Sequence, residues 1–206
     1  MPDITQALIC VVAGYLIGSI PFGVIAARLG GLGDIRKIGS GNIGATNVLR
    51  SGRKDLALLT LVGDAGKGAV AILLAWVLAK GSPDLQVLQA LAGGAAFFGH
   101  LFSVWLKFRG GKGVATFLGV MLAAWWPAGA LCCLTWLVMA VLFRISSLAA
   151  LTAAALSVAF VFFTDGPRPF VWLAFAMALL IFLRHHENIA RLLKGQEPRI
   201  GKKKAA

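Results

Sequence analysis

Residues Ile4–Ala27 read ITQALICVVAGYLIGSIPFGVIAA and contain no charged side chain. A helix that spans a membrane needs about 20 predominantly apolar residues, so this stretch is long enough. It follows Met-Pro-Asp rather than a positively charged segment, and it contains no Ala-x-Ala cleavage pattern. The sequence therefore predicts a span that is retained in the membrane, and not a signal peptide that is removed.

The composition extends this interpretation to the whole chain. Of its 206 residues, 59% are hydrophobic and 14% are charged, against about 45–50% and about 25% in soluble domains. Apolar stretches recur from Ile4 to Leu183, which leaves no polar half for a separate domain. These values exclude a soluble single-core protein. We expect one membrane-embedded domain over residues 1–206, ending in a basic tail at residues 195–206.

The remaining apolar stretches predict an all-α polytopic membrane protein. Leu56–Ala79 and Leu85–Phe108 each have the length of one span. Val114–Phe143 and Leu148–Leu183 are too long for one span, and each contains a turn signal. These signals are Trp125-Trp126-Pro127 in the first stretch and residues 164–169 in the second. The sequence therefore predicts seven transmembrane helices.

Three ionisable residues lie inside predicted spans. Asp64 and Lys67 interrupt the second span, which is either a broken helix or a helix that faces a polar interior. On a helix the two would be i, i+3 neighbours, and we expect them to neutralise one another. His100 lies near the end of the third span, where we favour a structural contact between helices over a functional role.

The basic residues support seven spans and give an orientation. With seven spans, seventeen of the 20 Lys and Arg residues lie on one side, whereas only Lys80 and Arg168 lie on the other. Lys and Arg concentrate in cytoplasmic loops, so we expect the N-terminus outside and the C-terminus in the cytoplasm. In a soluble protein the net charge of +12 would suggest nucleic-acid binding. Here the placement of the charges indicates a membrane topology instead.

Two glycine-rich loops are candidate phosphate sites. The first contains G-x-G-x-x-G at Gly39, Gly41 and Gly44, but a loop between membrane helices has no room for the βαβ unit of a dinucleotide site. Glycines still let backbone N–H groups approach an anion. Polar side chains in this loop can add further donors, namely Ser40, Asn42, Thr46 and Asn47. The alternative is a flexible polar linker.

The second loop, Gly110-Gly111-Lys112-Gly113, directly precedes a predicted helix. A helix N-terminus offers unpaired N–H groups and a positive dipole end, which favours an anion there. The loop is not a Walker A motif, because Gly113 stands where Ser or Thr would bind magnesium. The alternative is a basic turn that anchors the chain at the membrane surface.

The segment that follows the last span is a further candidate. On a helix, His185 and Asn188 would share a face, while His186 would lie about 100° from His185. One histidine could thus enter a site while the other stays in water, although both could equally be interfacial polar residues. Arg144 lies in the short loop before Ser147, where it could bind phosphate or anchor a helix. No zinc-binding spacing is present, and we expect no metal.

Together these residues resemble the bacterial membrane acyl-phosphate:glycerol-3-phosphate acyltransferase family (PlsY). The likeness rests on four segments in order, namely Tyr15–Gly23, Gly39–Arg50, Gly99–Thr116 and His185–Ile200. It implies a seven-helix enzyme of phospholipid synthesis that makes lysophosphatidate from acyl phosphate and glycerol 3-phosphate. It also implies the bacterial inner membrane, an active site that faces the cytoplasm, and no cofactor. The acyl-phosphate-producing enzyme is a candidate partner.

The expected site has three groups of residues. We assign catalysis to Lys112, His185 and Asn188. We assign acyl-phosphate binding to Ser40, Gly41, Asn42, Thr46, Asn47, Gly110, Gly111, Lys112 and Gly113. We assign glycerol-phosphate binding to Arg50, Lys112, Arg144, Ser147 and His185.

Two other classes of protein fit part of the sequence. A transporter for a phosphorylated metabolite would also contain intramembrane charge and broken helices. However, we find no clear inverted repeat, and the predicted donors cluster at one face. A lipid-binding scaffold fits the basic tail but leaves the glycine loops unexplained.

The predicted topology can be tested by labelling single cysteines in a variant from which Cys10, Cys132 and Cys133 have been removed. We expect a cysteine at Gly166 to react from outside the cell and one at Ser51 to react only from the cytoplasm. Reaction of both from the same side would exclude the seven-span arrangement.

Overall fold

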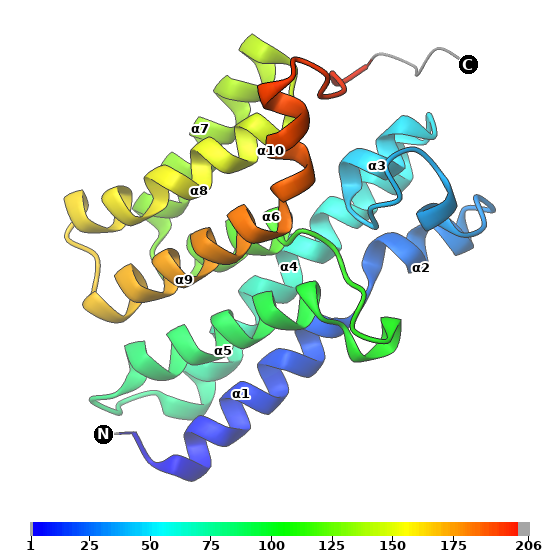
Figure 1. Cartoon of the computed structure of the whole chain (residues 1–206). Helices are drawn as coiled ribbons and strands as arrows, with labels where there is room; N and C mark the ends of the chain where they lie inside the picture. Colours follow the sequence, from blue (N-terminus) through cyan, green and yellow to red (C-terminus); the bar gives the residue numbers. More distant parts are fainter. Residues whose placement is uncertain (1, 202–206) are drawn as a thin grey trace.

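The computed structural model describes residues 2–201, and all of the regular secondary structure in this part is helical (Figure 1). Two short 3-10 helices, η1 (Ile35–Lys37) and η2 (Val104–Leu106), lie in loops. The α-helices are α1 (Ile4–Ser19), α2 (Phe22–Leu29), α3 (Ala45–Arg50), α4 (Lys54–Ala79), α5 (Leu85–Leu101), α6 (Val114–Ala124), α7 (Trp126–Phe143), α8 (Ser146–Phe163), α9 (Arg168–Arg184) and α10 (His186–Leu193).

Five helical segments of the described chain are long and apolar enough to cross a membrane, namely Ile4–Leu29, α4, Leu85–Leu106, α7 and α8. The pair α9 and α10, bent by 64°, would make a sixth. Helix α6 is apolar but has only 11 residues. An all-helical membrane architecture is therefore confirmed, whereas the count of seven spans and their orientation are not.

Several helix boundaries differ from the expected ones for identifiable reasons. The first stretch is divided into α1 and α2 at Ile20-Pro21, because proline lacks the N–H that would continue the helix. The third predicted span, Leu85–Phe108, is α-helical only as far as Leu101, seven residues before its expected end. The predicted break at Trp125 and the turn before Arg168 are confirmed.

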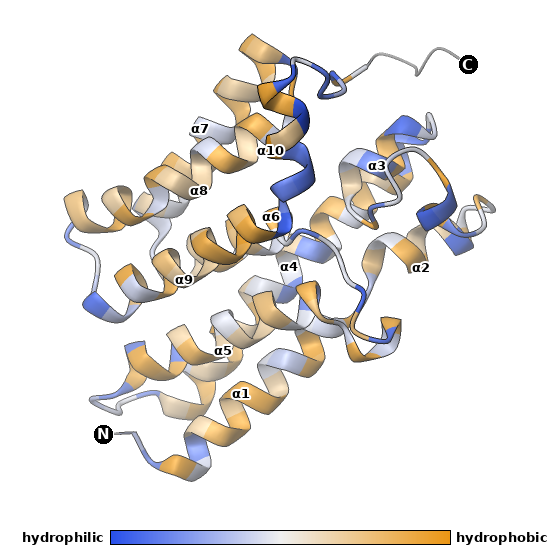
Figure 2. Ribbon diagram, in the orientation of Figure 1, coloured by the Kyte–Doolittle hydropathy of each residue, from blue (hydrophilic) through white to orange (hydrophobic). Residues whose placement is uncertain are grey.

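Small residues set the packing of the first helices. A Cβ added to Gly14 or Gly18 of α1 would overlap the backbone of Ala92 or Ala96 in α5. A Cβ on Gly99 would overlap the carbonyl oxygen of Tyr15. Such close approach is typical of membrane helices, which gain little hydrophobic driving force from one another. The exposed helix surfaces are largely apolar, while polar residues gather at the end that holds α2, α3 and α10 (Figure 2).

Helix α4 is continuous through Asp64 and Lys67, and both side chains are buried. The predicted pairing is confirmed, since Lys67 Nζ lies 2.9 Å from Asp64 Oδ1. Lys67 also donates to the carbonyl of Ile20, which the break before Pro21 has released from the helix. Nδ1 of His100 lies 3.6 Å from the same Asp64 oxygen. The three ionisable residues therefore connect α4, α5 and the end of α1.

Removal of one partner from this pair should cost much more stability than removal of both. Asp64→Leu leaves the Lys67 ammonium buried without its counter-ion, which typically costs about 3–5 kcal/mol. The double variant Asp64→Leu/Lys67→Met leaves no unpaired charge, and we expect it to recover most of the loss. Thermal denaturation in detergent measures both. A double variant no more stable than Asp64→Leu would contradict this interpretation.

Candidate active site

The second glycine loop is fixed from two sides. The N–H groups of Gly110 and Gly111 donate to the carbonyls of Leu101 and His100 at the end of α5, both at 3.1 Å. From the other side, the guanidinium of Arg184 donates to the carbonyl oxygens of Gly110 and Gly111 at 3.1–3.2 Å. These two glycines therefore shape the loop and use their N–H groups internally. The unpaired N–H groups at the start of α6 are the ones left for an anion.

Only glycine fits two positions of this loop. A Cβ on Gly110 would overlap the carbonyl oxygen of His100, which belongs to the backbone and cannot turn aside. Gly113 has φ 84°, a conformation that side chains other than glycine rarely adopt, and a Cβ there would overlap the ring of Phe97. The loop can thus hold Lys112 directly beside the start of α6.

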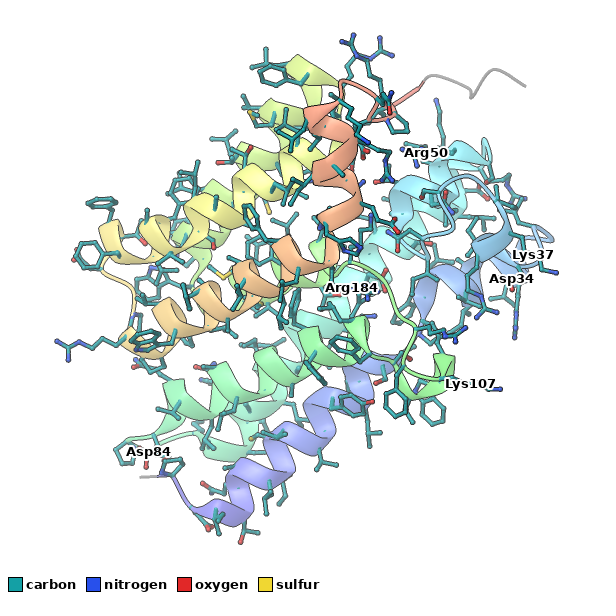
Figure 3. The ribbon with its side chains drawn as sticks, viewed as in Figure 1. Asp34, Lys37, Arg50, Asp84, Lys107 and Arg184 are labelled. Carbon is teal, nitrogen blue, oxygen red and sulfur yellow. The ribbon has the colours of Figure 1, made fainter. Side chains whose placement is uncertain are left out.

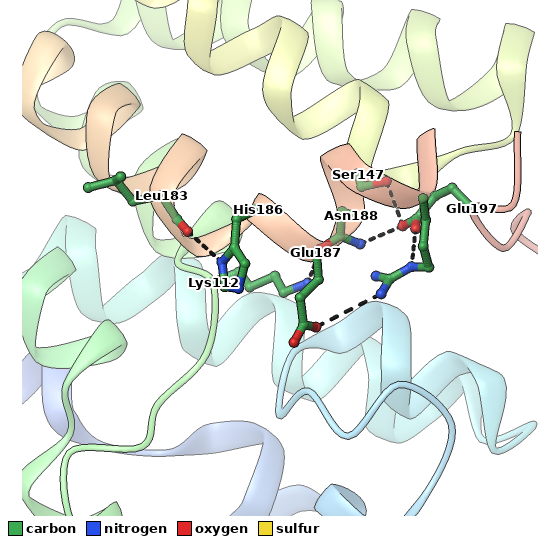
Figure 4. A network of polar contacts seen from close by, with 8 residues as sticks. Lys112, Ser147, Leu183, His186, Glu187, Asn188 and Glu197 are labelled. Carbon is green, nitrogen blue, oxygen red and sulfur yellow. Dashed lines mark hydrogen bonds and ion pairs between the residues drawn. The ribbon is translucent and has the colours of Figure 1, made fainter. Parts of the chain in front are cut away.

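Lys112 meets Asn188 from α10, although 76 positions separate them in sequence (Figure 4). Its Nζ donates to the Asn188 side-chain oxygen, and the Asn188 amide donates in turn to Glu197. Lys112 is partly buried. Burial, and secondarily the positive charge of Arg191, lower the pKa of Lys112 from its ordinary value of 10.5. Its ammonium is therefore poorly hydrated, which strengthens its attraction for a phosphate.

Glu197 is the point where this network ends. Its side chain is 5% exposed and accepts hydrogen bonds from Ser147 and Arg191, both at 2.7 Å, in addition to Asn188. Burial alone would raise the pKa of Glu197, but these hydrogen bonds outweigh it and lower the pKa below the ordinary 4.5. The carboxylate thus joins the start of α8, helix α10 and the tail.

The two histidines differ in burial as expected, but the chain reaches this arrangement by a bend. Instead of one continuous helix, the chain turns by 64° between α9 and α10, at His185. His185 is buried and His186 is exposed. Nδ1 of His185 lies 2.8 Å from the carbonyl oxygen of Ile181. A carbonyl only accepts, so Nδ1 carries the proton, and in the neutral ring Nε2 is left as a hydrogen-bond acceptor.

In the first glycine loop, the structure gives Asn47 a supporting role. Its amide donates to the carbonyls of Ile35 and Ile38, and its oxygen accepts from the N–H of Ser40 at 2.9 Å. Both amide hydrogens of Asn47 are thus engaged within the protein. The loop reaches α8 through Thr46 Oγ1, which lies 3.1 Å from Ser146 Oγ.

The remaining predicted residues lie around this centre. Ser40 and Gly41 are exposed, and Asn42 is partly exposed. Arg50 ends α3 (Figure 3) and is partly exposed. Arg144 is exposed and donates to the carbonyl oxygen of Ile200, so its visible contact is with the tail. The structure therefore joins Lys112 directly to Asn188 and joins Ser147 to them through Glu197, whereas Arg50 and Arg144 lie outside the network.

This arrangement can be compared with known proteins. Residues 8–195 match the model of the family described as glycerol-3-phosphate acyltransferase. A glycerol-3-phosphate acyltransferase of Caulobacter vibrioides is 69% identical over 198 residues, covering 96% of this chain and 89% of the relative. The chain belongs to the glycerol-3-phosphate acyltransferase family. Another member, from Rhodospirillum rubrum, is 58% identical over 96% of this chain and 93% of its own length.

Two crystal structures of the family member PlsY (YgiH), an integral membrane glycerol 3-phosphate acyltransferase, have the same fold. The glycerol 3-phosphate form superposes with a TM-score of 0.87 at 39% identity, covering 95% of this chain and 96% of that one. The lysophosphatidic acid form gives 0.86. The expected resemblance to the PlsY family is thus confirmed.

Sequence reasoning assigned no role to three residues of the site, namely Arg184, Arg191 and Glu197. Arg184 was counted only as one of the cytoplasmic basic residues, although it supports the glycine loop. Glu197 carried a usable signal, because it is the only acidic residue between Arg191 and the C-terminus. A single carboxylate within such a basic segment indicates an internal partner.

Lys112→Ala should lose activity while the protein remains folded. A charge-assisted contact to phosphate is worth about 1.5–3 kcal/mol, or roughly ten- to a hundred-fold in binding or rate. The matched control is Lys107→Ala, since Lys107 is exposed and makes no contact with the network. Steady-state acyltransferase assays after size-exclusion chromatography compare the two. Small and equal effects would mean that the loop only anchors the chain at the membrane.

Proposed function

We propose that this protein transfers a fatty acyl group from acyl phosphate to the 1-hydroxyl of glycerol 3-phosphate. The products are lysophosphatidate and inorganic phosphate. The observation that carries the proposal is the chain of contacts from Lys112 through Asn188 to Glu197, beside buried His185. It places a partly desolvated cation and two polar side chains at the start of α6, in a family whose relatives are named for glycerol 3-phosphate acylation.

The reaction needs orientation and charge stabilisation more than a strong base. The 1-hydroxyl oxygen attacks the acyl carbonyl carbon, the bond between that carbon and the phosphate oxygen breaks, and phosphate leaves with the electron pair. Because an acyl phosphate is an activated mixed anhydride, positioning and cationic donors supply most of the catalysis. The hydroxyl proton passes to an acceptor, for which Nε2 of His185 and a substrate phosphate oxygen are the two candidates.

We assign the residues as follows. Lys112 neutralises phosphate charge, and Asn188 and His185 orient the reacting groups. Acyl phosphate binds at the start of α6, along a loop shaped by Gly110, Gly111 and Gly113, and against Ser40, Gly41, Asn42 and Thr46. Asn47 acts indirectly, by holding the first loop. Arg50, Arg144 and Ser147 approach glycerol 3-phosphate, for which Arg144 has to leave the carbonyl of Ile200.

The choice of acyl phosphate as the donor rests on chemistry. The H-x-x-x-x-D pattern of other glycerolipid acyltransferases is missing after His100, His185 and His186. In the proposed site, Nδ1 of His185 meets a backbone carbonyl and not a carboxylate, so His185 is not activated as a strong base. Such a site, with cations and N–H donors, suits a donor that brings its own phosphate leaving group.

For the membrane arrangement, we propose seven spans in the bacterial inner membrane, with α6 as a short span and the site on the cytoplasmic side. Helix α6 is packed within the bundle, where a short apolar helix can be accommodated by local thinning of the bilayer. The distribution of basic residues supports this orientation.

The direct test is to incubate purified protein with acyl phosphate and labelled glycerol 3-phosphate, and to detect labelled lysophosphatidate. Acyl-CoA and acyl carrier protein replace acyl phosphate in parallel reactions. Product from acyl phosphate alone supports the proposal. Uptake of label into sealed liposomes without product would support a transporter instead.

The two histidines should differ in their effect on this activity. We expect severe loss in His185→Ala and Asn188→Ala, because both side chains are buried within the site, and nearly normal activity in exposed His186→Ala. The pH profile then identifies the proton acceptor. If it is His185, the acidic limb of kcat/KM disappears from the residual activity of His185→Gln. If it is a substrate phosphate, that limb remains. An active His185→Ala protein beside an inactive His186→Ala protein would refute the assignment.

A further inference from the structure

A second cluster of cations lies on the same end of the bundle but outside the network of Lys112. Residues of α2, η1 and the segment around η2 enclose a cavity of about 530 Å³. It is lined by Arg28, Arg36, Trp105, Leu106, Lys107 and Arg109. None of these side chains takes part in the contacts that join Lys112, Asn188 and Glu197. The cavity therefore requires a separate explanation.

The charge of this cavity is largely uncompensated. Arg36 forms an ion pair with Asp34 at 2.8 Å. Within residues 2–201, Arg28, Lys107 and Arg109 make no ion pair with any carboxylate. Three cations that share one cavity repel each other, and an anion in the cavity would relieve that repulsion.

The position of the cavity matches the level of lipid headgroups. The candidate spans Ile4–Leu29 and Leu85–Leu106 both end at it. Trp105 and Phe108 are 62% and 60% exposed, and aromatic side chains concentrate where hydrocarbon meets water. Figure 3 shows Lys107 at the outer edge of the molecule, away from Arg184.

The cavity is also preformed. Lys107 and Phe108 both adopt left-handed backbone conformations, which turn the chain sharply after η2. The turn is held by the hydrogen bond from the N–H of Phe108 to the carbonyl of Ser103 at 2.8 Å. Ser103 is buried and itself donates to the carbonyl of Ser19 at 2.5 Å. This hydrogen-bonded turn sets the course of the backbone from which Lys107 and Arg109 extend.

We infer that this cavity binds the phosphate headgroup of an anionic glycerophospholipid from the surrounding bilayer. Basic pockets at the ends of membrane helices suit such headgroups. The exposed aromatic residues beside the cations favour a lipid over an acidic protein, because they would lie against its glycerol and upper acyl chains. The site is distinct from the proposed substrate site, and its test does not depend on acyltransferase activity.

The test uses the full-length protein in detergent, titrated with phosphatidylglycerol whose acyl chains are brominated near the headgroup. Bromine quenches nearby indoles, and a parallel titration of Trp105→Phe isolates the contribution of Trp105. We compare the unmodified protein with Lys107→Gln/Arg109→Gln. Each basic residue near an anionic lipid contributes about a factor of five, so this variant should bind roughly thirty-fold more weakly.

The matched control is Lys80→Gln/Arg168→Gln, which removes the same charge at the opposite end of the bundle. We expect it to bind like the unmodified protein. Brominated phosphatidylcholine should bind weakly, and inorganic phosphate or glycerol 3-phosphate should not displace phosphatidylglycerol. All of the altered residues are exposed or at helix ends, and elution volumes check that the variants are folded.

Four results would overturn the inference. Equal binding of both lipids would remove the role of the headgroup charge. Equal loss in both double variants would show a general charge effect. Displacement by glycerol 3-phosphate would make the cavity part of the substrate site. Unchanged binding of phosphatidylglycerol by Lys107→Gln/Arg109→Gln would show that these cations do not bind the lipid, and would favour an acidic protein partner instead.

Discussion

The buried carboxylate of Glu197 is the interaction on which the candidate site depends. A carboxylate that is 5% exposed must be satisfied internally, and three donors from two helices, α8 and α10, do so. One of them, Asn188, donates through its amide nitrogen, and its side-chain oxygen therefore faces Lys112 and accepts a hydrogen bond from Nζ. The orientation of the amide, and hence the position of the ammonium, follows from the carboxylate. Glu197 in the tail therefore sets the positions of Asn188 and Lys112.

The apolar bundle makes this ordering possible by keeping its helices close together. Glycine and alanine contacts between α1 and α5 bring the end of α5 to a fixed place, where the carbonyls of His100 and Leu101 receive the glycine loop. The pair of Asp64 and Lys67 serves the same end from within the bundle, since Lys67 also satisfies the carbonyl released by the break at Pro21. Close helix packing and the pairing of buried polar groups thus both help to position the Gly110–Gly113 loop.

The parts of this structure that depend on local composition could be predicted from the sequence. The length of the apolar stretches predicted the long helices, and Trp125 and Pro127 predicted the break between α6 and α7. The i, i+3 spacing predicted the pair of Asp64 and Lys67. Helical spacing also predicted that one of His185 and His186 could be buried while the other is exposed, although the structure produces this difference at a bend and not along one helix. These features are set by residues that lie close together in the chain.

The remaining features depend on contacts between distant segments, which periodicity does not encode. The role of Asn47 depends on two carbonyls, those of Ile35 and Ile38, that only a folded loop brings to its amide. In the sequence, Arg184 is only a basic residue at the end of a helix. Its role depends on hydrogen bonds to the glycine loop, which the folded chain brings to it. The bend at His185 likewise could not be predicted from local sequence, since no proline or glycine lies beside it.

The location of Glu197 after the last helix has a consequence for biogenesis. The ribosome must complete all of the helices from α1 to α10 before the carboxylate can join Ser147, Asn188 and Arg191. A chain that stops at Lys194 could insert its helices and still leave Asn188 without the acceptor that orients it. A proteolytic cut between Lys194 and Glu197 would have the same effect, because it separates the carboxylate from α10 and leaves the apolar helices intact.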